Sequence, residues 1–365
     1  MKYILQIHAG AWHESQYRAG QIIDRLREIL TFLPVEKVLT GWTLDPMLYD
    51  EIGSFLHAQG IELFLWLPVF SETDLLLPVE PAKDIFGKEI GTPKINDGAA
   101  FTFCCPSSVK NLDQTKQIYE TYFAACPFDG VFLDRIRTQS FVSGIRGVLS
   151  CGCKTCSDLY ERRGVSLKET AKHYTGAGDR FFDVSADFPN DGYAFTDPYA
   201  AAFFQAKASV ISESVRSLCT YFHEKGLGVG LDLFAPFLAS FVGQDYRELG
   251  HQADFIKPML YRRTDAPAGL GYEYRQLRKS IKTAEGYREI DMDDTFLCSQ
   301  LTAIADLPCK KYPGIEVNRD EYTVKTDSSY IRDSLALFRD HGMDGAVLSW
   351  DVMRAPDEHL KFTNI

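Results

Sequence analysis

The sequence has no long hydrophobic run, no excess of basic residues and no glycine-rich phosphate loop. No apolar stretch approaches the length of a membrane-spanning helix, so we expect no membrane partner. Asp and Glu outnumber Lys and Arg by 50 to 39, which gives a net charge of −11. Binding to a nucleic-acid backbone needs a basic surface, so we expect no nucleic-acid partner. The AGAW segment after the first predicted strand also lacks the spaced glycines of a dinucleotide-binding turn.

The N-terminal segment also lacks the pattern of an export signal. Its short apolar run is interrupted by Gln6 and His8, which is more typical of a first strand. We therefore expect a cytoplasmic protein. The nine cysteines are then expected as reduced thiols and not as disulfides. The sequence leaves open whether the chain forms a homo-oligomer, because none of its features sets the number of subunits.

What the sequence does contain is a repeated pattern of amphipathic helix, glycine and short apolar strand. Eight such strands predict an α/β fold, namely a single-domain (β/α)8 TIM barrel over residues 1–365. Gly60, Gly226 and Gly342 end helices just before strands, as left-handed helix caps do. A doubly wound open sheet is the alternative. The strands are predicted at residues 3–7, 37–41, 61–70, 131–134, 227–236, 254–262, 314–318 and 345–350.

The longest interruption of this pattern follows the fourth predicted strand. Residues 138–197 are predicted to form an insertion, or loop subdomain, that carries a cysteine cluster. Another long loop, rich in Pro, Gly, Asp and Lys, covers residues 71–101. Loops of this length inside a compact domain are usually functional or disordered.

Carboxylates stand at the carboxyl ends of several predicted strands, where the active site of a barrel lies. Asp134 ends the fourth strand, Asp232 lies in the glycine-rich fifth strand, and Glu316 lies in the seventh. Paired carboxylates at a barrel mouth suit hydrolysis of a glycosidic bond. One protonates the leaving oxygen, and the other is the nucleophile or activates water. We therefore predict that Asp134, Glu316 and Asp232 are catalytic, with a structural salt bridge as the alternative role for Asp134.

Aromatic and basic side chains are predicted at the same end of the barrel. The four tryptophans lie in or just after strands one, two, three and eight, which are neighbours in a closed barrel. Flat aromatic faces stack well on the apolar face of a sugar. Lys257 and Tyr261 are four residues apart and so share one face of their strand. The predicted substrate-binding residues are His8, Trp12, Trp42, Trp66, Arg135, Lys257, Tyr261 and Trp350.

Three thiols lie close together after the fourth strand, at Cys151, Cys153 and Cys156, and Cys104 and Cys105 lie upstream. One upstream thiolate would complete a tetrahedral zinc site. An iron–sulfur centre and unligated thiols are the alternatives. Because no histidine occurs near the triplet, we expect a structural metal, and we expect no organic cofactor.

The cysteine cluster resembles that of family 42 β-galactosidases, in which a CxCxxC triplet after barrel strand four and an upstream cysteine bind zinc. The resemblance implies a zinc site formed by Cys151, Cys153, Cys156 and either Cys105 or Cys104. The FDGVFLDRIR motif is also similar to the strand-four motif of uncharacterised glycoside-hydrolase-like barrels.

The wider layout resembles the clan A glycoside hydrolases. That clan carries its acid/base at strand four, its nucleophile at strand seven, a Tyr on strand six and a Trp on strand eight. The corresponding positions here are Asp134, Glu316, Tyr261 and Trp350.

The fourth strand departs from the clan A pattern, because Leu133-Asp134 stands where that clan has Asn-Glu. In an alternative found in other sugar-cleaving barrels, Asp134 would be the nucleophile and Asp232 or Glu316 the acid. The sequence thus predicts a glycoside hydrolase that acts on a small oligosaccharide or glycoside. A non-catalytic carbohydrate-binding barrel is the alternative. A metal-dependent barrel hydrolase is disfavoured, because the first strand lacks an HxH pair.

Overall fold

The computed structural model describes residues 1–91, 102–175, 183–186, 193–280, 282–283 and 290–362. Its centre is a closed barrel of parallel strands, in which the first and last strands pair and Tyr3 lies opposite Ala346. This closure confirms the predicted (β/α)8 barrel and excludes the open sheet. In order around the barrel, the strands are β1 (Lys2–Trp12), β3 (Val35–Thr43), β4 (Glu62–Pro68), β5 (Gly130–Asp134), β8 (Gly228–Phe234), β9 (Phe255–Met259), β12 (Gly314–Glu316) and β13 (Gly345–Ser349).

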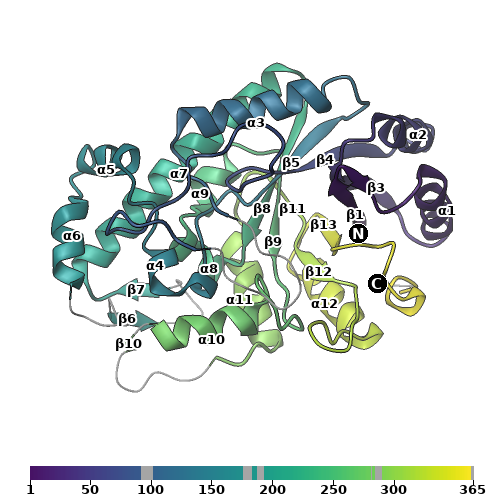
Figure 1. Ribbon diagram of the computed structural model, residues 1–365. Helices are drawn as coiled ribbons and strands as arrows, with labels where there is room; N and C mark the ends of the chain where they lie inside the picture. The colour runs from purple at the N-terminus through teal and green to yellow at the C-terminus, as the bar shows by residue number, and fades with distance from the viewer. Residues whose placement is uncertain (92–101, 176–182, 187–192, 281, 284–289, 363–365) are drawn as a thin grey trace.

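Helices surround the barrel and connect its strands (Figure 1). Between β8 and β9 the connection is made by two short helices instead of one long helix. The α-helices are α1 (Ala19–Leu30), α2 (Pro46–His57), α3 (Val109–Tyr122), α4 (Gly144–Val148), α5 (Lys154–Glu161), α6 (Leu167–Tyr174), α7 (Pro198–Glu224), α8 (Pro236–Val242), α9 (Tyr246–Gly250), α10 (Leu270–Ser280), α11 (Asp294–Ile304) and α12 (Ser328–Asp340). Two 3-10 helices, η1 (Phe141–Ser143) and η2 (Asp357–His359), complete this layer, whereas the short strands β2 (Glu14–Ser15) and β11 (Lys310–Lys311) pair with β1 and β9 of the barrel.

Local sequence signals explain where several helices begin and end. Asp45 caps α2 by accepting hydrogen bonds from the backbone N–H groups of Met47 and Leu48, and Pro46 occupies the first helical position. Asp197 caps α7 in the same way. Gly60, Gly226 and Gly342 all have positive φ, between 70° and 79°, as predicted for left-handed caps.

The barrel interior is a separate aromatic and aliphatic core. Because side chains alternate along a strand, every second residue points inward. The inner cluster consists of Ile4, Leu39, Phe64, Trp66, Phe132, Phe255, Tyr312 and Val347, and Trp42 packs against it. A larger core lies between the barrel and its helices. The inner cluster fills the barrel interior, and polar side chains lie toward the carboxyl ends of the strands.

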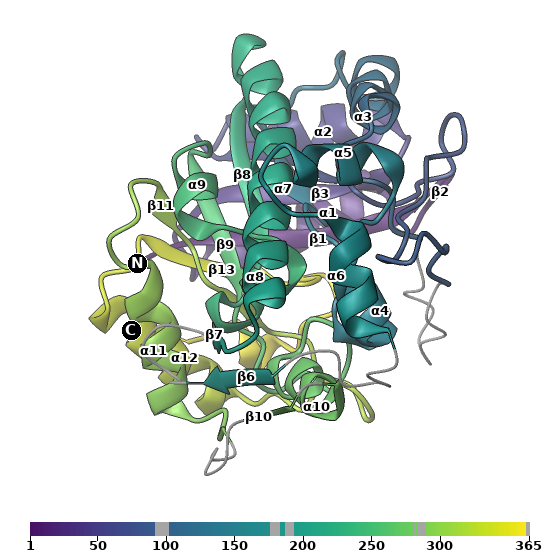
Figure 2. The same ribbon diagram turned by 90° about the vertical axis from the view of Figure 1, so that its left-hand side faces the viewer.

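The segment between β5 and α7 forms an outer lobe. Here α4, α5 and α6 lie beside α7, on the side of the molecule away from α1 and α2 (Figures 1 and 2). A small sheet joins β6 (Asp183–Ala186) to β7 (Tyr193–Phe195) and to β10 (Lys282–Thr283), which comes from the region after α10. The lobe contains three of the cysteines of the cluster, whereas Cys105 lies at the end of the loop after β4.

Candidate active site and metal centre

Asp134 ends β5, and hydrogen bonds hold both of its carboxylate oxygens. The indole N–H of Trp66, on neighbouring β4, donates to Oδ2 at 2.9 Å, and the backbone N–H of Arg135 donates to Oδ1 at 2.5 Å. The Arg135 backbone is itself left-handed, with φ of 55°. Such a conformation is uncommon for a residue with a side chain, and strained residues cluster at functional sites. The plane of the Asp134 carboxylate is therefore fixed.

Asp232, on β8, is buried beside Lys257 of β9. The Lys257 ammonium donates to Asp232 Oδ2 at 3.1 Å and to Gln6 Oε1 at 3.2 Å. Within the described part of the chain, Asp232 Oδ1 and Gln6 Nε2 have no hydrogen-bond partner. Both predicted residues thus lie inside the barrel, and one Asp232 oxygen there has no hydrogen-bond partner in the described residues.

Asp134 and Asp232 occupy neighbouring positions on adjacent strands. Leu133 is the Cα partner of Leu231, and the two aspartates come one position further along. Adjacent strands lie about 4.8 Å apart. Burial raises the pKa of Asp232 to about 7, the Lys257 ammonium opposes this rise, and the charge of Asp134 adds to it. Two adjacent carboxyl groups therefore lie in different environments.

Glu316, the third predicted carboxylate, is fully buried and turned toward the loop after β9 and toward α12. Its Oε1 accepts a hydrogen bond from the backbone N–H of Arg263 at 2.6 Å, and its Oε2 accepts one from the Tyr330 hydroxyl at 3.1 Å. In the described residues it makes no hydrogen bond or ion pair with either aspartate. Burial raises the pKa of Glu316 to about 7.

Three of the four tryptophans pack together with His8 at one side of the strand ends. Trp12 and Trp42 are stacked, with ring centroids 5.9 Å apart, and Trp42 lies 5.3 Å from Trp66. The His8 ring lies edge-on to Trp42 at 5.1 Å. Trp12 and Trp42 have φ of 49° and 70°, so the backbone is left-handed at both positions. The sequence-predicted aromatic residues of β1, β3 and β4 therefore form one cluster.

The Arg135 guanidinium covers the Trp42 ring at 4.6 Å and donates to the Ser71 hydroxyl at 3.0 Å. Burial lowers the pKa of Arg135 to about 10. This residue links the tryptophan cluster to the loop after β4. Trp350 follows β13, which pairs with β1, and packs edge-on against Tyr261 at 5.2 Å, so these two predicted residues form a second aromatic group.

Three charged residues near the site were not among the predicted site residues. The Arg137 guanidinium lies between the rings of Phe103 and Phe234, at 4.8 and 4.3 Å. Glu273 of α10 is buried, and its carboxylate accepts a hydrogen bond from the Ser140 hydroxyl at 2.9 Å.

Asp351, the third of these residues, follows β13 and accepts a hydrogen bond from the Tyr17 hydroxyl at 2.9 Å. The DRIR motif could have indicated Arg137, and the position after a strand could have indicated Asp351. Glu273 carries no local signal, because an isolated glutamate in a helix is usually exposed.

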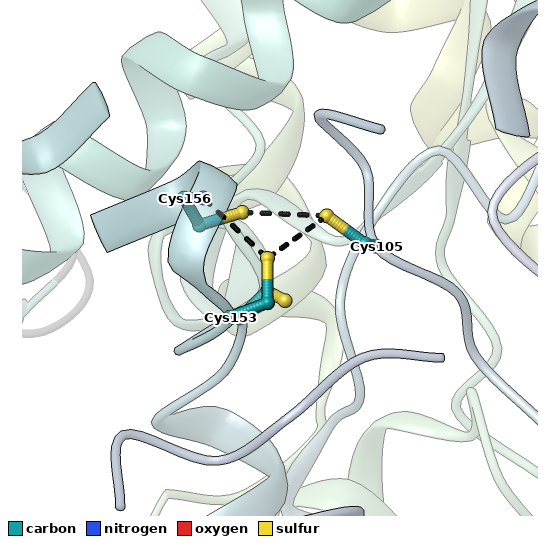
Figure 3. Close-up of side chains that lie close together, drawn as sticks. Cys105, Cys153 and Cys156 are labelled. Carbon is teal, nitrogen blue, oxygen red and sulfur yellow. Dashed lines mark hydrogen bonds between the residues drawn. The ribbon is translucent and has the colours of Figure 1, made fainter. Parts of the chain in front are cut away.

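Four cysteines meet where the outer lobe contacts the loop after β4. The Sγ atoms of Cys105, Cys151, Cys153 and Cys156 all lie within 4.8 Å of one another. Figure 3 shows the sulfurs of Cys105, Cys153 and Cys156 directed toward a common point. Cys105 Sγ lies 3.3 Å from Cys153 Sγ and 3.6 Å from Cys156 Sγ. Cys104 points elsewhere, toward the carbonyl oxygen of Val69, so Cys105 is the upstream member of the cluster.

The donor set fits a tetrahedral metal ion. Zinc bound at about 2.3 Å by four thiolates separates their sulfurs by about 3.8 Å, close to the observed spacing. The sulfurs are too far apart for a disulfide, whose S–S bond is about 2.05 Å. The approach of the two segments needs Gly152, because a Cβ there would lie 2.2 Å from the Asp84 carbonyl oxygen. The four cysteines could therefore bind a metal ion.

The sequence matches no family model and no curated protein. Among solved structures, the PgaB (BpsB) glycoside hydrolase domain from Bordetella bronchiseptica is similar, with a TM-score of 0.59 and 15% identity over 96% of this chain and 95% of that chain. Alpha-L-fucosidase isoenzyme 2 from Paenibacillus thiaminolyticus has a TM-score of 0.52 and 12% identity over 99% of this chain and 48% of its own. At these identities the likeness shows a shared barrel fold.

None of the helices in the described ranges combines the length and the apolar character needed to cross a bilayer.

Proposed function

We propose that the chain is a glycoside hydrolase that cleaves a small oligosaccharide or glycoside, with Asp134 as the nucleophile and Asp232 as the general acid. The proposal rests on the pairing of two carboxyl groups on adjacent strands at the carboxyl end of a barrel. Their different surroundings favour different roles, since a general acid needs a raised pKa and a nucleophile needs a fixed orientation. Two solved barrels with a similar fold are a glycoside hydrolase domain and a fucosidase, which supports the same reaction class.

The chemistry follows from these two roles. Asp232 transfers its proton to the glycosidic oxygen as the bond to the anomeric carbon breaks, and Asp134 Oδ1 or Oδ2 forms a bond to that carbon. The leaving alcohol departs. Water then attacks the anomeric carbon and gives up a proton to Asp232, and the bond to Asp134 breaks. The enzyme returns to its starting protonation state.

The short separation of the two strands supports retention of configuration. Retaining enzymes hold their carboxyl groups about 5–5.5 Å apart, whereas inverting enzymes leave about 6.5–9.5 Å for a water molecule. The backbones at these two positions lie about 4.8 Å apart on adjacent strands, a spacing that allows their carboxyl groups to approach to the shorter range. The tryptophan cluster on β1, β3 and β4 supports a carbohydrate ligand, because indole rings stack on sugars.

The test is a screen of aryl glycosides of both anomers, with the configuration of the first product followed by NMR. For any substrate that is cleaved, we expect Asp134→Asn and Asp232→Asn each to lower kcat about 10²–10⁴-fold. Glu316→Gln is the matched control, because Glu316 is a buried carboxylate at the same end of the barrel that is engaged by Arg263 and Tyr330. We expect this variant to keep most of the activity.

Other outcomes would assign the site differently. Loss of activity in Glu316→Gln together with normal activity in Asp232→Asn would move the second catalytic role to Glu316. Sugar binding without cleavage of any glycoside would favour a carbohydrate-binding barrel. An inverted first product would exclude Asp134 as the nucleophile.

We also infer that Cys105, Cys151, Cys153 and Cys156 hold a structural zinc ion. Four thiolates fill a tetrahedral coordination sphere, so such a centre offers no open position to a substrate. When bound, zinc would cross-link the loop after β4 to the outer lobe. Cys105, Cys151 and Cys156 are buried, as a permanent site requires, and Cys153 is partly buried.

A further inference from the structure

Lys207, on α7, is a fully buried lysine without a carboxylate partner. Its side chain has no exposed area, and no Asp or Glu of the described residues forms an ion pair with it. A buried charge is costly unless it is paired and hydrogen-bonded. Lys257, another lysine with no exposed area, meets this requirement through Asp232. Groups other than carboxylates must therefore stabilise the charge of Lys207.

The surroundings of Lys207 Nζ match an ammonium group. Three oxygens accept from it, namely the carbonyl of Phe241 at 2.6 Å, the carbonyl of Val148 at 2.7 Å and Thr138 Oγ1 at 3.2 Å. An ammonium has three N–H donors, one for each acceptor, whereas a neutral amine has two. Phe204 also lies beneath the charge, with its ring centroid 4.7 Å away.

Two of the three acceptors are carbonyls at the carboxyl ends of helices. Val148 is the last residue of α4, and Phe241 is the penultimate residue of α8. Helix carboxyl ends carry partial negative charge and favour a cation. Partial charges of this kind stabilise Lys207, but they leave its full positive charge without a counter-ion.

The chain that carries the Val148 acceptor continues into the cysteine cluster. Cys151 follows Val148 by three residues and is fully buried. Burial lowers the pKa of Lys207, and Cys151 is the ionisable group that opposes this effect. Four thiolates around a divalent metal ion carry a net charge of −2, which a nearby ammonium can partly neutralise.

We propose that Lys207 is the counter-ion of the tetrathiolate metal centre and ties that centre to the loop that follows the catalytic strand β5. The proposal rests on the zinc site inferred above. Thr138, one of the three acceptors, comes four residues after Asp134 and also donates its backbone N–H to the Val242 carbonyl at 3.1 Å. The Lys207 ammonium thereby joins α4, α8 and the loop after β5, and the chain runs from α4 to Cys151 within three residues. Lys207 is a positioning residue, because it acts through these neighbours.

The test compares the zinc affinity of the full chain with that of two variants, by competition with a chromophoric chelator. Lys207→Gln keeps a hydrogen-bond donor but removes the charge, and Lys207→Met removes both. Substitution of groups that support a metal site typically lowers metal affinity 10–100-fold, and we expect a loss of about this size in both variants. Ser214→Ala is the control. Ser214 is another buried polar residue of α7, and it bonds only within its helix.

The outcomes separate the two proposals. If the wild type binds no stoichiometric zinc, the zinc site itself is wrong, and the role of Lys207 falls with it. If the wild type binds zinc and Lys207→Gln binds it within about twofold of the wild type, only the counter-ion role is overturned. Equal losses in the Ser214→Ala control would also overturn it.

A measurement on the wild type covers the case in which the variants fail to fold. We expect removal of zinc to speed amide hydrogen exchange at residues 138–148 and 241–244, which Lys207 joins. The amides of Leu63 and Val229, bonded to Asp129 and Asp254 at the opposite end of the barrel, should keep their protection. Unchanged exchange in both ranges would contradict the proposed coupling.

Discussion

Trp66 donates its indole N–H to the carboxylate of Asp134, so a side chain on β4 holds the proposed nucleophile on β5. The two residues lie on paired strands, in which Trp66 is the Cα partner of Phe132 and Pro68 is the partner of Asp134. Trp66 is buried and its ring contacts Trp42. This tryptophan therefore orients the proposed nucleophile in addition to belonging to the aromatic cluster.

Replacing Trp66 by Phe should lower kcat and leave KM nearly unchanged. Hydrogen bonds to charged groups contribute about 1.5–3 kcal/mol, so we expect kcat to fall about 10- to 100-fold. Phe keeps the aromatic packing but removes the N–H donor. Steady-state kinetics of the variant on any cleaved glycoside tests this. A rise in KM at constant kcat would instead assign Trp66 to sugar binding.

The pH dependence should report the ionisation of Asp232. As the general acid, Asp232 acts in its protonated form, and its pKa is raised to about 7. We therefore expect kcat/KM, which reports the free enzyme, to fall as the pH rises through about 7. The measurement is a pH–rate profile on one aryl glycoside. A profile that rises across neutral pH would exclude Asp232 as the acid.

Replacing Lys257 by Met should move that decline to higher pH. The Lys257 ammonium favours the charged form of Asp232, so its removal raises the pKa of the acid further. Lys37→Met is the control, because Lys37 is a buried lysine near the amino end of β3 that pairs with Glu62. The control should leave the position of the decline unchanged. A decline at the same or lower pH in Lys257→Met would contradict the pairing.

Substitution of two adjacent cysteines tests the metal site. Cys104 and Cys105 are both buried, but only Cys105 belongs to the cluster. We expect Cys104→Ser to retain one metal ion per chain after purification under reducing conditions and Cys105→Ser to lose it, as measured by elemental analysis. Because metal binding contributes to folding, a chelator should lower the Tm of Cys104→Ser and not that of Cys105→Ser. Equal metal content in the two variants would contradict the assignment.

The sequence alone predicted the barrel, the helix caps and the end of the barrel at which polar groups gather. These features depend on residues that are close in the chain. Asp45 and Pro46 start a helix, Gly226 ends one, and the apolar run before Asp134 forms a strand. The same local spacing identified Cys151, Cys153 and Cys156 as a cluster.

Only the tertiary structure decided which of these residues meet. The register of β5 and β8 places Asp134 beside Asp232, whereas the packing of α12 turns Glu316 toward Tyr330. The path of the loop after β4 selects Cys105 over Cys104. Lys207 and Glu273 lie on helices whose sequence pattern marks no site. Contacts between distant segments depend on strand register and helix packing, which local periodicity does not encode.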